Sequence, residues 1–320
     1  MKEIGGYFGL EPLISNEYYP DLIALNNARN ALLYLLKSTN IKKLYIPYFL
    51  CDSVSGICDR EGYSYEYYNI GQDFLPIFDQ HLDNGEYIYV VNYYGQLNNS
   101  MVQMLQKRHG NIIFDNVQAF FQRPVKGIDT LYSCRKFFGV PDGAYLATDA
   151  LLDEPLTQDV SKDRMKHVLG RYEHDCASDY YADFKTNDDS FVGLELRSMS
   201  KLTHNILGAI DYQRVIAKRN QNWIALHDAL GKINKLSLTM PNGPYMYPFY
   251  HENGMEIKKK LAQKRIFVPT LWPNVLDFND CELEKDYAQN ILPLPVDQRY
   301  DAEDMKRIIQ KIFECEHEGR

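Results

Sequence analysis

Helical and strand-like patterns of hydrophobic residues alternate along the first 150 residues of the chain. Apolar residues recur on one face of a helix that begins just after Asn26 or Asn27, either of which can cap it. Short apolar runs predict strands at 43–46, 64–68, 87–91, 111–114, 130–133 and 144–148, with helices at 52–60 and between Ser100 and Gly110. This alternation predicts an α/β fold with a largely parallel sheet and helices on both faces.

The pattern changes twice in the second half of the chain. Residues 150–225 are mainly helical in pattern and locally acidic, as in "EHDCASDYYADFKTNDDSF". Beyond residue 230, strands at 235–238, 245–250 and 266–268 mix with helices at 255–263 and after Asp301. We therefore expect a large domain over 1–228 and a smaller α+β domain over 229–320.

Composition and charge argue against several classes of protein. The net charge is −8, so we expect neither nucleic acid nor an anionic membrane as the main partner. The chain has no apolar run of membrane-spanning length and no signal-peptide pattern at its start, so we expect a cytoplasmic protein. Its six cysteines form no CxxC pair and its eight histidines lack ligand spacing, so no metal site is expected.

Three charged residues fall at the predicted ends of strands and helices. Asp115 directly follows the strand at 111–114, and Lys136 lies three residues beyond Ser133, where the strand at 130–133 ends. Arg29 stands at the start of the first helix. In an open α/β sheet ligands bind beyond the carboxyl ends of the strands, so we expect these groups to meet there.

Together these groups are what pyridoxal 5′-phosphate (PLP) requires. A helix start with a guanidinium stabilises a phosphate, a lysine in a dry pocket forms a Schiff base with an aldehyde, and an aspartate keeps a pyridine nitrogen protonated. Each residue alone is common on a protein surface, so the inference depends on their order and shared location. Lys201, in a second SxxK at 198–201, is an alternative to Lys136, but no strand precedes it.

The chain also resembles a known family, the DegT/DnrJ/StrS group of PLP-dependent sugar aminotransferases. "FDNVQAFF" resembles the family's strand–Asp–x–x–Gln element, which implies that Asp115 contacts the pyridine nitrogen and Gln118 the ring oxygen. "YSCRKFFGVPDGAYLAT" resembles the segment of the Schiff-base lysine, which implies that role for Lys136 and a phosphate contact for Ser133.

The resemblance extends to the phosphate-binding helix start, "NNARNALLYLL". It implies phosphate contacts for Asn27, Ala28 and Arg29, where the family usually has small Ser-Gly-Thr residues. A larger Arg29 could bind the phosphate or block it.

The family usually stacks an aromatic residue from the loop after Pro47 on the cofactor ring. Here Cys51 lies near that point, which leaves Tyr48, or else Tyr93 or Tyr94, as candidates for the stacking role. "KLTHNILGAID" resembles the segment that reaches into the partner's site in the family's homodimers, so Asn205 is a candidate for that contact.

The resemblance implies the aspartate-aminotransferase fold type I, with a seven-stranded, mostly parallel sheet and a small C-terminal α+β domain. It implies a homodimeric aminotransferase that moves an amino group from an amino acid, usually glutamate, to a keto sugar, which is expected to be nucleotide-linked. Lys136 disfavours the family's dehydratases, which have histidine at that position, and the lack of GxGxxG disfavours a nicotinamide enzyme. The alternative is a degenerate member without PLP that acts as a binding or assembly protein.

Overall fold

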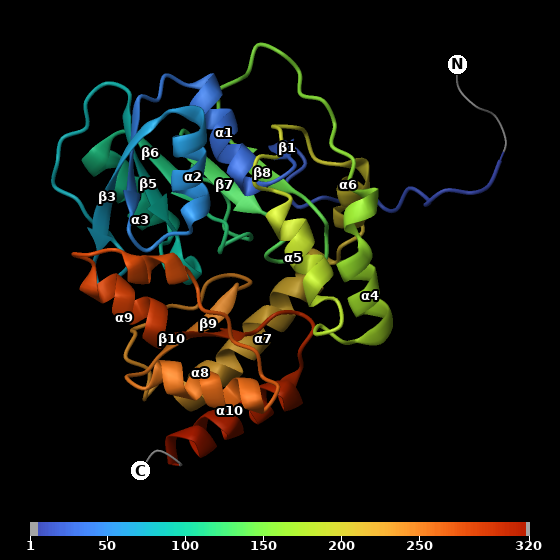
Figure 1. Ribbon diagram of the computed structural model, residues 1–320, viewed down its shortest axis with the longest axis vertical. Coiled ribbons are helices and arrows are strands. Elements are labelled where there is room, and N and C mark those ends of the chain that lie inside the picture. The colour runs from blue at the N-terminus through green and yellow to red at the C-terminus, as the bar shows by residue number, and fades with distance from the viewer. Residues whose placement is uncertain (1–5, 318–320) are drawn as a thin grey trace.

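The computed structural model describes residues 6–317. They form a large sheet with helices around it and, below it in Figure 1, a smaller region of helices and two strands. One hydrophobic cluster joins the two regions, since it contains Leu44 of the sheet and Tyr287 of the smaller region. A second cluster includes Leu226, Phe249 and Ile312. The mixed α/β architecture expected from the sequence is confirmed.

Within residues 6–317 the large sheet has eight strands. Their spatial order is β1 (Ile23–Leu25), β8 (Ala144–Ala147), β7 (Asp129–Ser133), β6 (Ile112–Asp115), β5 (Glu86–Val91), β2 (Lys43–Pro47), β3 (Ser64–Ile70) and β4 (Pro76–Ile77). The central strands from β7 to β3 are parallel, whereas β8, β1 and β4 join antiparallel. The resemblance implied seven strands. The edge strands β1 and β4, of three and two residues, are too short to show an alternating pattern and were not predicted.

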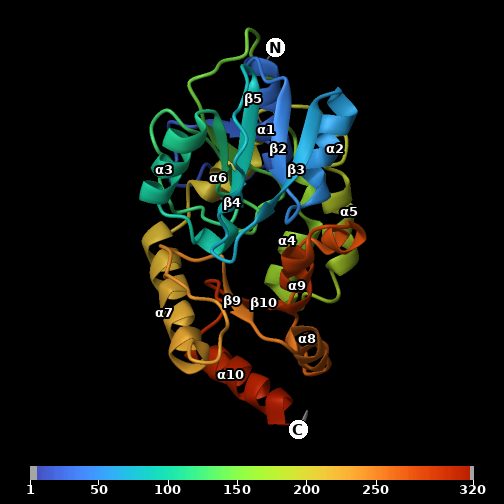
Figure 2. The ribbon, with the colours of Figure 1, turned by 90° about the vertical axis from the view of Figure 1, so that its left-hand side faces the viewer.

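Helices α1 (Ala28–Ser38), α2 (Asp52–Glu61) and α3 (Asn99–His109) pack on this sheet, with α2 and α3 on opposite sides of it in Figure 2. Helix α1 begins where predicted because the Asn27 Oδ1 accepts the N–H of Asn30 at 2.8 Å. Helix α3 begins earlier than predicted, since Asn98 rather than Ser100 caps it. Two short 3-10 turns also occur: η1 (Tyr93–Gly95) lies between β5 and α3, and η2 (Lys162–Arg164) lies after β8.

Four helices connect the sheet with the smaller region: α4 (Lys166–His174), α5 (Tyr181–Asp189), α6 (Lys201–Leu207) and α7 (Tyr212–Leu230). Helix α7 crosses the expected domain boundary at 228, and its Trp223 and Leu226 pack in the second hydrophobic cluster. None of the helices in residues 6–317 is long and apolar enough to cross a membrane.

The smaller region contains α8 (Gly254–Gln263), η3 (Pro273–Asp277), α9 (Glu282–Asn290) and α10 (Ala302–His317), with β9 (Met246–Tyr250) antiparallel to β10 (Ile291–Pro295). The strands predicted at 235–238 and 266–268 are wrong. Asn234 instead satisfies the N–H groups of Leu236 and Tyr250, and Arg265 has a φ of 59°, which ends regular structure there. The prolines of β10 hid this strand, but they are tolerated because the two-stranded sheet has only edges.

Candidate active site

A cavity of about 270 Å³ lies at the carboxyl ends of β5, β6 and β7, beside the start of α1. Asn27, Ala28, Arg29, Asp115, Ser133 and Lys136 all line it. The sequence argument predicted that these positions would converge, and they do so because parallel neighbouring strands end at one edge of the sheet. The volume is slightly below that of pockets for drug-sized ligands, about 300–1,000 Å³, and suits one small ring with a short tail.

Asp115 is the last residue of β6 and is only 4% exposed. Its Oδ2 accepts a hydrogen bond from the Tyr89 hydroxyl at 2.8 Å, and its Oδ1 accepts the N–H of Val117 at 2.8 Å. Burial raises the pKa of Asp115, and this outweighs the lowering effects of the Lys136 charge and the two hydrogen bonds. A cation that enters the cavity near this carboxyl would therefore favour its ionised form.

Lys136 follows β7 in a tight turn in which the N–H groups of Phe137 and Phe138 bond to the carbonyl of Cys134. The turn leads back into β8 through Gly143, which has a φ of 115°, a conformation that favours glycine. Cys134 and Thr203 also lie too close to Gly143 to leave room for a Cβ. The Lys136 Nζ lies 5.6 Å from the ring centroid of Tyr245. Lys136 thus lines the cavity together with Asp115, and its charge acts on the pKa of that acid.

The start of α1 supplies hydrogen-bond donors to the same cavity. Asn27 is 6% exposed, and while its Oδ1 caps the helix, its Nδ2 has no hydrogen-bond partner. An unpartnered buried donor costs about 1–3 kcal/mol, so it points to a ligand that accepts from it. With the free N–H groups of the helix start and Arg29 beside it, this end of the cavity is suited to an anion.

The sequence argument missed an arginine and an aspartate that line this cavity. Arg135, the neighbour of Lys136, pairs through its Nη1 with the Asp188 Oδ1 at 3.1 Å, and its guanidinium carbon lies 4.3 Å from the ring centroid of Phe191. "SCRK" displayed the arginine, but nothing in the sequence indicates that the end of α5 packs against it.

The structure places the tyrosines considered for stacking, Tyr48, Tyr93 and Tyr94, outside the lining of the cavity. The ring of Tyr48 stacks on Tyr67 at 4.9 Å, and the hydroxyl of Tyr93 donates to the carbonyl of Phe49 at 2.7 Å. Phe191 and Trp272 line the cavity. Sequence reasoning had no means of finding Trp272, which lies 136 residues beyond Lys136 in the irregular segment before η3.

Gln118 and Asn205 also lie outside the lining of the cavity. The Gln118 Oε1 accepts the N–H of Tyr94 at 2.8 Å, and its buried Nε2 has no partner. Asn205 holds the N-terminal segment, since its Oδ1 accepts the N–H of Leu13 at 2.7 Å and its Nδ2 donates to the Glu11 carbonyl at 3.0 Å. A contact between Asn205 and a second chain stays a prediction.

The alternative lysine, Lys201, is the exposed first residue of α6. Ser200 caps that helix and bonds to the buried carboxylate of Asp142, so this SxxK sequence serves the helix start. Because Lys201 does not line the cavity, the geometry favours Lys136.

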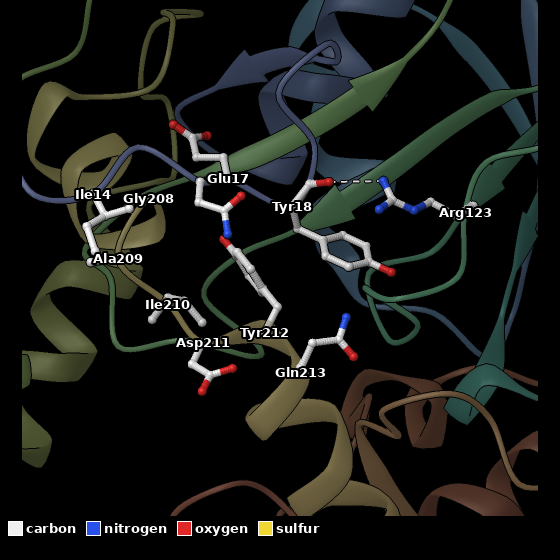
Figure 3. A pocket seen from close by; sticks show the side chains of 11 residues that line it. Ile14, Glu17, Tyr18, Arg123, Gly208, Ala209, Ile210, Asp211, Tyr212 and Gln213 are labelled. Carbon is white, nitrogen blue, oxygen red and sulfur yellow. Dashed lines mark hydrogen bonds between the residues drawn. The ribbon is translucent and has the colours of Figure 1, made fainter.

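A second cavity, of about 440 Å³, lies between the N-terminal segment and the turn from α6 to α7 (Figure 3). Arg123 reaches across its rim and donates to the carbonyl of Tyr18 at 2.9 Å, as the dashed line in Figure 3 shows. Glu17 pairs with the Nδ1 of His204 at 2.7 Å. No lysine lines this cavity, so the chemistry expected from the sequence belongs to the smaller one.

The smaller cavity fits PLP by its donor set. Its lining contains the unpartnered Asn27 Nδ2, the helix start and two guanidinium groups, together with a buried acid and Lys136. Within residues 6–317 no group of three or more histidine, cysteine, aspartate or glutamate side chains could hold a metal.

Comparison with solved structures identifies the fold, whereas no family model and no curated protein matches the sequence. Among solved structures the chain is similar to PseC of Helicobacter pylori, an aminotransferase involved in the biosynthesis of pseudoaminic acid, with 14% identity over 91% of this chain and 85% of that one and a TM-score of 0.60.

Two further structures extend the likeness. A DegT DnrJ EryC1 StrS aminotransferase from Brucella abortus has 15% identity over 91% of this chain and 85% of that one, with a TM-score of 0.58. NtdA of Bacillus subtilis, with bound cofactor PMP, has 15% identity over 92% of this chain and 73% of that one, with a TM-score of 0.65. The chain therefore has the fold of sugar aminotransferases, as the sequence resemblance implied.

Proposed function

We propose that the protein is a PLP-dependent aminotransferase that acts on a keto sugar. The observation that carries the proposal is the shared cavity, in which Lys136 and the buried acid Asp115 lie together beside a helix start with an unpartnered donor. A sugar aminotransferase is among the solved structures that share this fold, which supports the sugar as substrate class. A nucleotide carrier on the sugar and glutamate as the amino donor are part of the proposal.

Six residues that line the cavity have proposed tasks in this reaction. Asn27, Ala28, Arg29 and Ser133 would hold the phosphate, and the Asp115 carboxylate would stabilise the protonated ring nitrogen. When bound, PLP would supply an aldehyde that condenses with amines and a ring that accepts an electron pair. The Nζ of Lys136 would act as the base that takes the proton from the amine-bearing carbon of the substrate, and then as the acid that gives this proton back within the site.

We also propose roles for residues that lie outside the lining of the cavity. Gln118 is proposed to contact the ring oxygen, which its unpartnered Nε2 supports, and Tyr48 or Tyr93 is the stacking candidate from the resemblance. Because Phe191 and Trp272 line the cavity, we include them as candidates for the same stacking role.

We also propose a cytoplasmic homodimer in which Asn205 contributes to the partner's site. Cys51, Cys58, Cys134, Cys176 and Cys281 form no disulfide, which supports a reducing compartment. Large apolar residues that are well exposed on the N-terminal segment and on α4 and α5 support an interface: Tyr7, Phe8, Ile14, Leu169, Tyr172 and Tyr181.

The experiment that tests the proposal is the absorbance of the purified protein with PLP. We expect a band in the near-ultraviolet to violet that borohydride abolishes, and mass spectrometry of the digest should find the pyridoxyl group on Lys136. Lys136→Ala should lose the band, while Lys201→Ala, which changes the other SxxK lysine, should keep it. A parent protein that stays colourless with added PLP would contradict the proposal.

The alternative is a binding protein without PLP, and one contact favours it. Tyr89 lines the cavity and already occupies the Asp115 oxygen Oδ2, so the acid has its hydrogen bonds without any cofactor. A colourless protein whose cavity binds no PLP in a dialysis experiment would support this alternative.

A further inference from the structure

We propose that Arg135 is a second guanidinium ligand for the phosphate group of the cofactor, and that Asp188 is its counter-ion until the phosphate displaces it. The assignment rests on the proposed function, since it concerns the ligand of the same cavity. It adds two residues that neither the sequence argument nor the resemblance assigned.

The position of Arg135 places its charge at the cavity. The residue lies between Ser133 and Lys136 in the turn after β7, its side chain is 17% exposed, and it lines the cavity together with Arg29. The ring of Phe191 lies 4.3 Å below its guanidinium carbon and limits its movement. The guanidinium is therefore fixed at the wall of the cavity.

The positive charges of Arg29 and Arg135 favour the binding of an anion beside them in the cavity. Burial lowers the pKa of Arg135, and the neighbouring charge of Arg29 lowers it further, whereas Asp188 raises it. A phosphate monoester carries about −1.5 to −2 charges near neutral pH and accepts paired hydrogen bonds from guanidinium groups. Two guanidiniums and the unpartnered Asn27 Nδ2 match such a group in charge and in donors.

Asp188 is suited to give way to a phosphate. Its side chain is 45% exposed, and a half-solvated ion pair gains little from Coulomb attraction in water. It also lies in the last turn of α5, where the helix dipole disfavours a carboxylate. An aspartate at this place therefore does not stabilise α5, and the ion pair with Arg135 is the contact that accounts for it.

The test measures binding of PLP, of pyridoxal, which lacks the phosphate, and of inorganic phosphate by titration calorimetry. We expect Arg135→Gln to weaken PLP and phosphate about tenfold or more, the loss of one charge-assisted hydrogen bond, and to leave pyridoxal within about twofold. Asp188→Asn should tighten phosphate binding in the parent but have no effect in the Arg135→Gln background, because the aspartate competes only for that guanidinium.

The matched control is Arg164→Gln. Arg164 also lies over Phe191, at 5.5 Å, and pairs with Asp159 at 2.6 Å, but it does not line the cavity, so its loss should leave all three titrations unchanged. Thermal unfolding of each variant checks the fold, and Arg135→Lys, which retains the charge, provides a second variant with a smaller expected loss.

Equal weakening of PLP and pyridoxal by Arg135→Gln would overturn the assignment, as would an unchanged affinity for phosphate. A nucleoside diphosphate, titrated in the same way, is the further probe: if Arg135→Gln weakened its binding but not that of PLP, the assignment would be overturned, because the arginine would then serve the substrate. These outcomes are distinct from failure of the proposed function, in which the parent protein with PLP forms no borohydride-sensitive band on Lys136.

Discussion

At the scale of single residues, the Tyr89 hydroxyl decides how the acid of the site is held. Tyr89→Phe removes one of two donors to a buried carboxyl, so we expect the free energy of unfolding to fall by about 1–3 kcal/mol and PLP to bind more weakly. Tyr68→Phe is the control, because Tyr68 is also buried and donates to the carbonyl of Tyr89 at 2.7 Å without touching Asp115. Equal PLP affinity in both variants, measured by fluorescence titration, would show that Tyr89 has no part in the site.

The buried Asp115 also gives the cofactor-free protein a dependence of stability on pH. Because burial raises its pKa above the ordinary value of 3.8, the folded protein binds this proton more tightly than the unfolded chain does. Its contribution to stability is greatest below 3.8 and is lost as the pH rises through the folded pKa. Urea unfolding across this range should show the decline in the parent protein, and Asp115→Asn should remove it. Identical pH profiles for the two proteins would contradict the raised pKa.

At the scale of the elements, the turn from Lys136 into β8 depends on Gly143. Gly143 has a φ of 115°, and a Cβ added there would lie 2.9 Å from the Thr203 Cγ2 and 3.2 Å from the Cys134 Cβ, which leaves no room for it. Gly143→Ala should therefore destabilise the fold by about 1–3 kcal/mol and weaken PLP binding, because the turn carries Lys136. Gly56→Ala, in the middle of α2 with open space around it, should instead stabilise the protein by about 0.5–1 kcal/mol. Chemical denaturation of both variants measures the contrast.

The N-terminal segment is tied to α6 by a pair that titrates. The hydrogen bond to Glu17 raises the pKa of His204, although burial opposes it, while burial raises the pKa of Glu17 less than its bonds to His204 and Tyr145 lower it. The histidine contributes stability below 6.5 and loses it as the pH rises through its folded pKa. The glutamate contributes above 4.5 and loses it on acidification through its folded pKa, so attachment is strongest between these values. Protection factors for hydrogen exchange in residues 14–19 should be highest in this pH range, and His204→Gln should abolish that maximum.

At the scale of the whole molecule, the sequence predicted what local patterns determine. Buried parallel strands show as apolar runs, so β2, β5, β6 and β7 were found, and strands that end at one edge brought Asp115 and Lys136 to one cavity. Tertiary contacts determine the rest. The pair of Arg135 and Asp188 joins residues 53 positions apart, and the prolines of β10 hid a strand that only its partner β9 reveals.

The last prediction concerns assembly. The N-terminal segment presents Tyr7 and Phe8 at 98% and 94% exposure, although aromatic side chains of this kind usually anchor interfaces. We expect the parent protein to sediment as a dimer and the double variant Tyr7→Ser and Phe8→Ser to shift toward monomer, because two aromatic anchors are lost. Leu151→Ser is the control, since Leu151 is 74% exposed on the loop after β8, outside this segment, and the variant should leave the dimer intact. A parent protein that sediments as a monomer at every concentration would leave these aromatic residues without an interface, and the proposed role of Asn205 in a partner's site would fail with it.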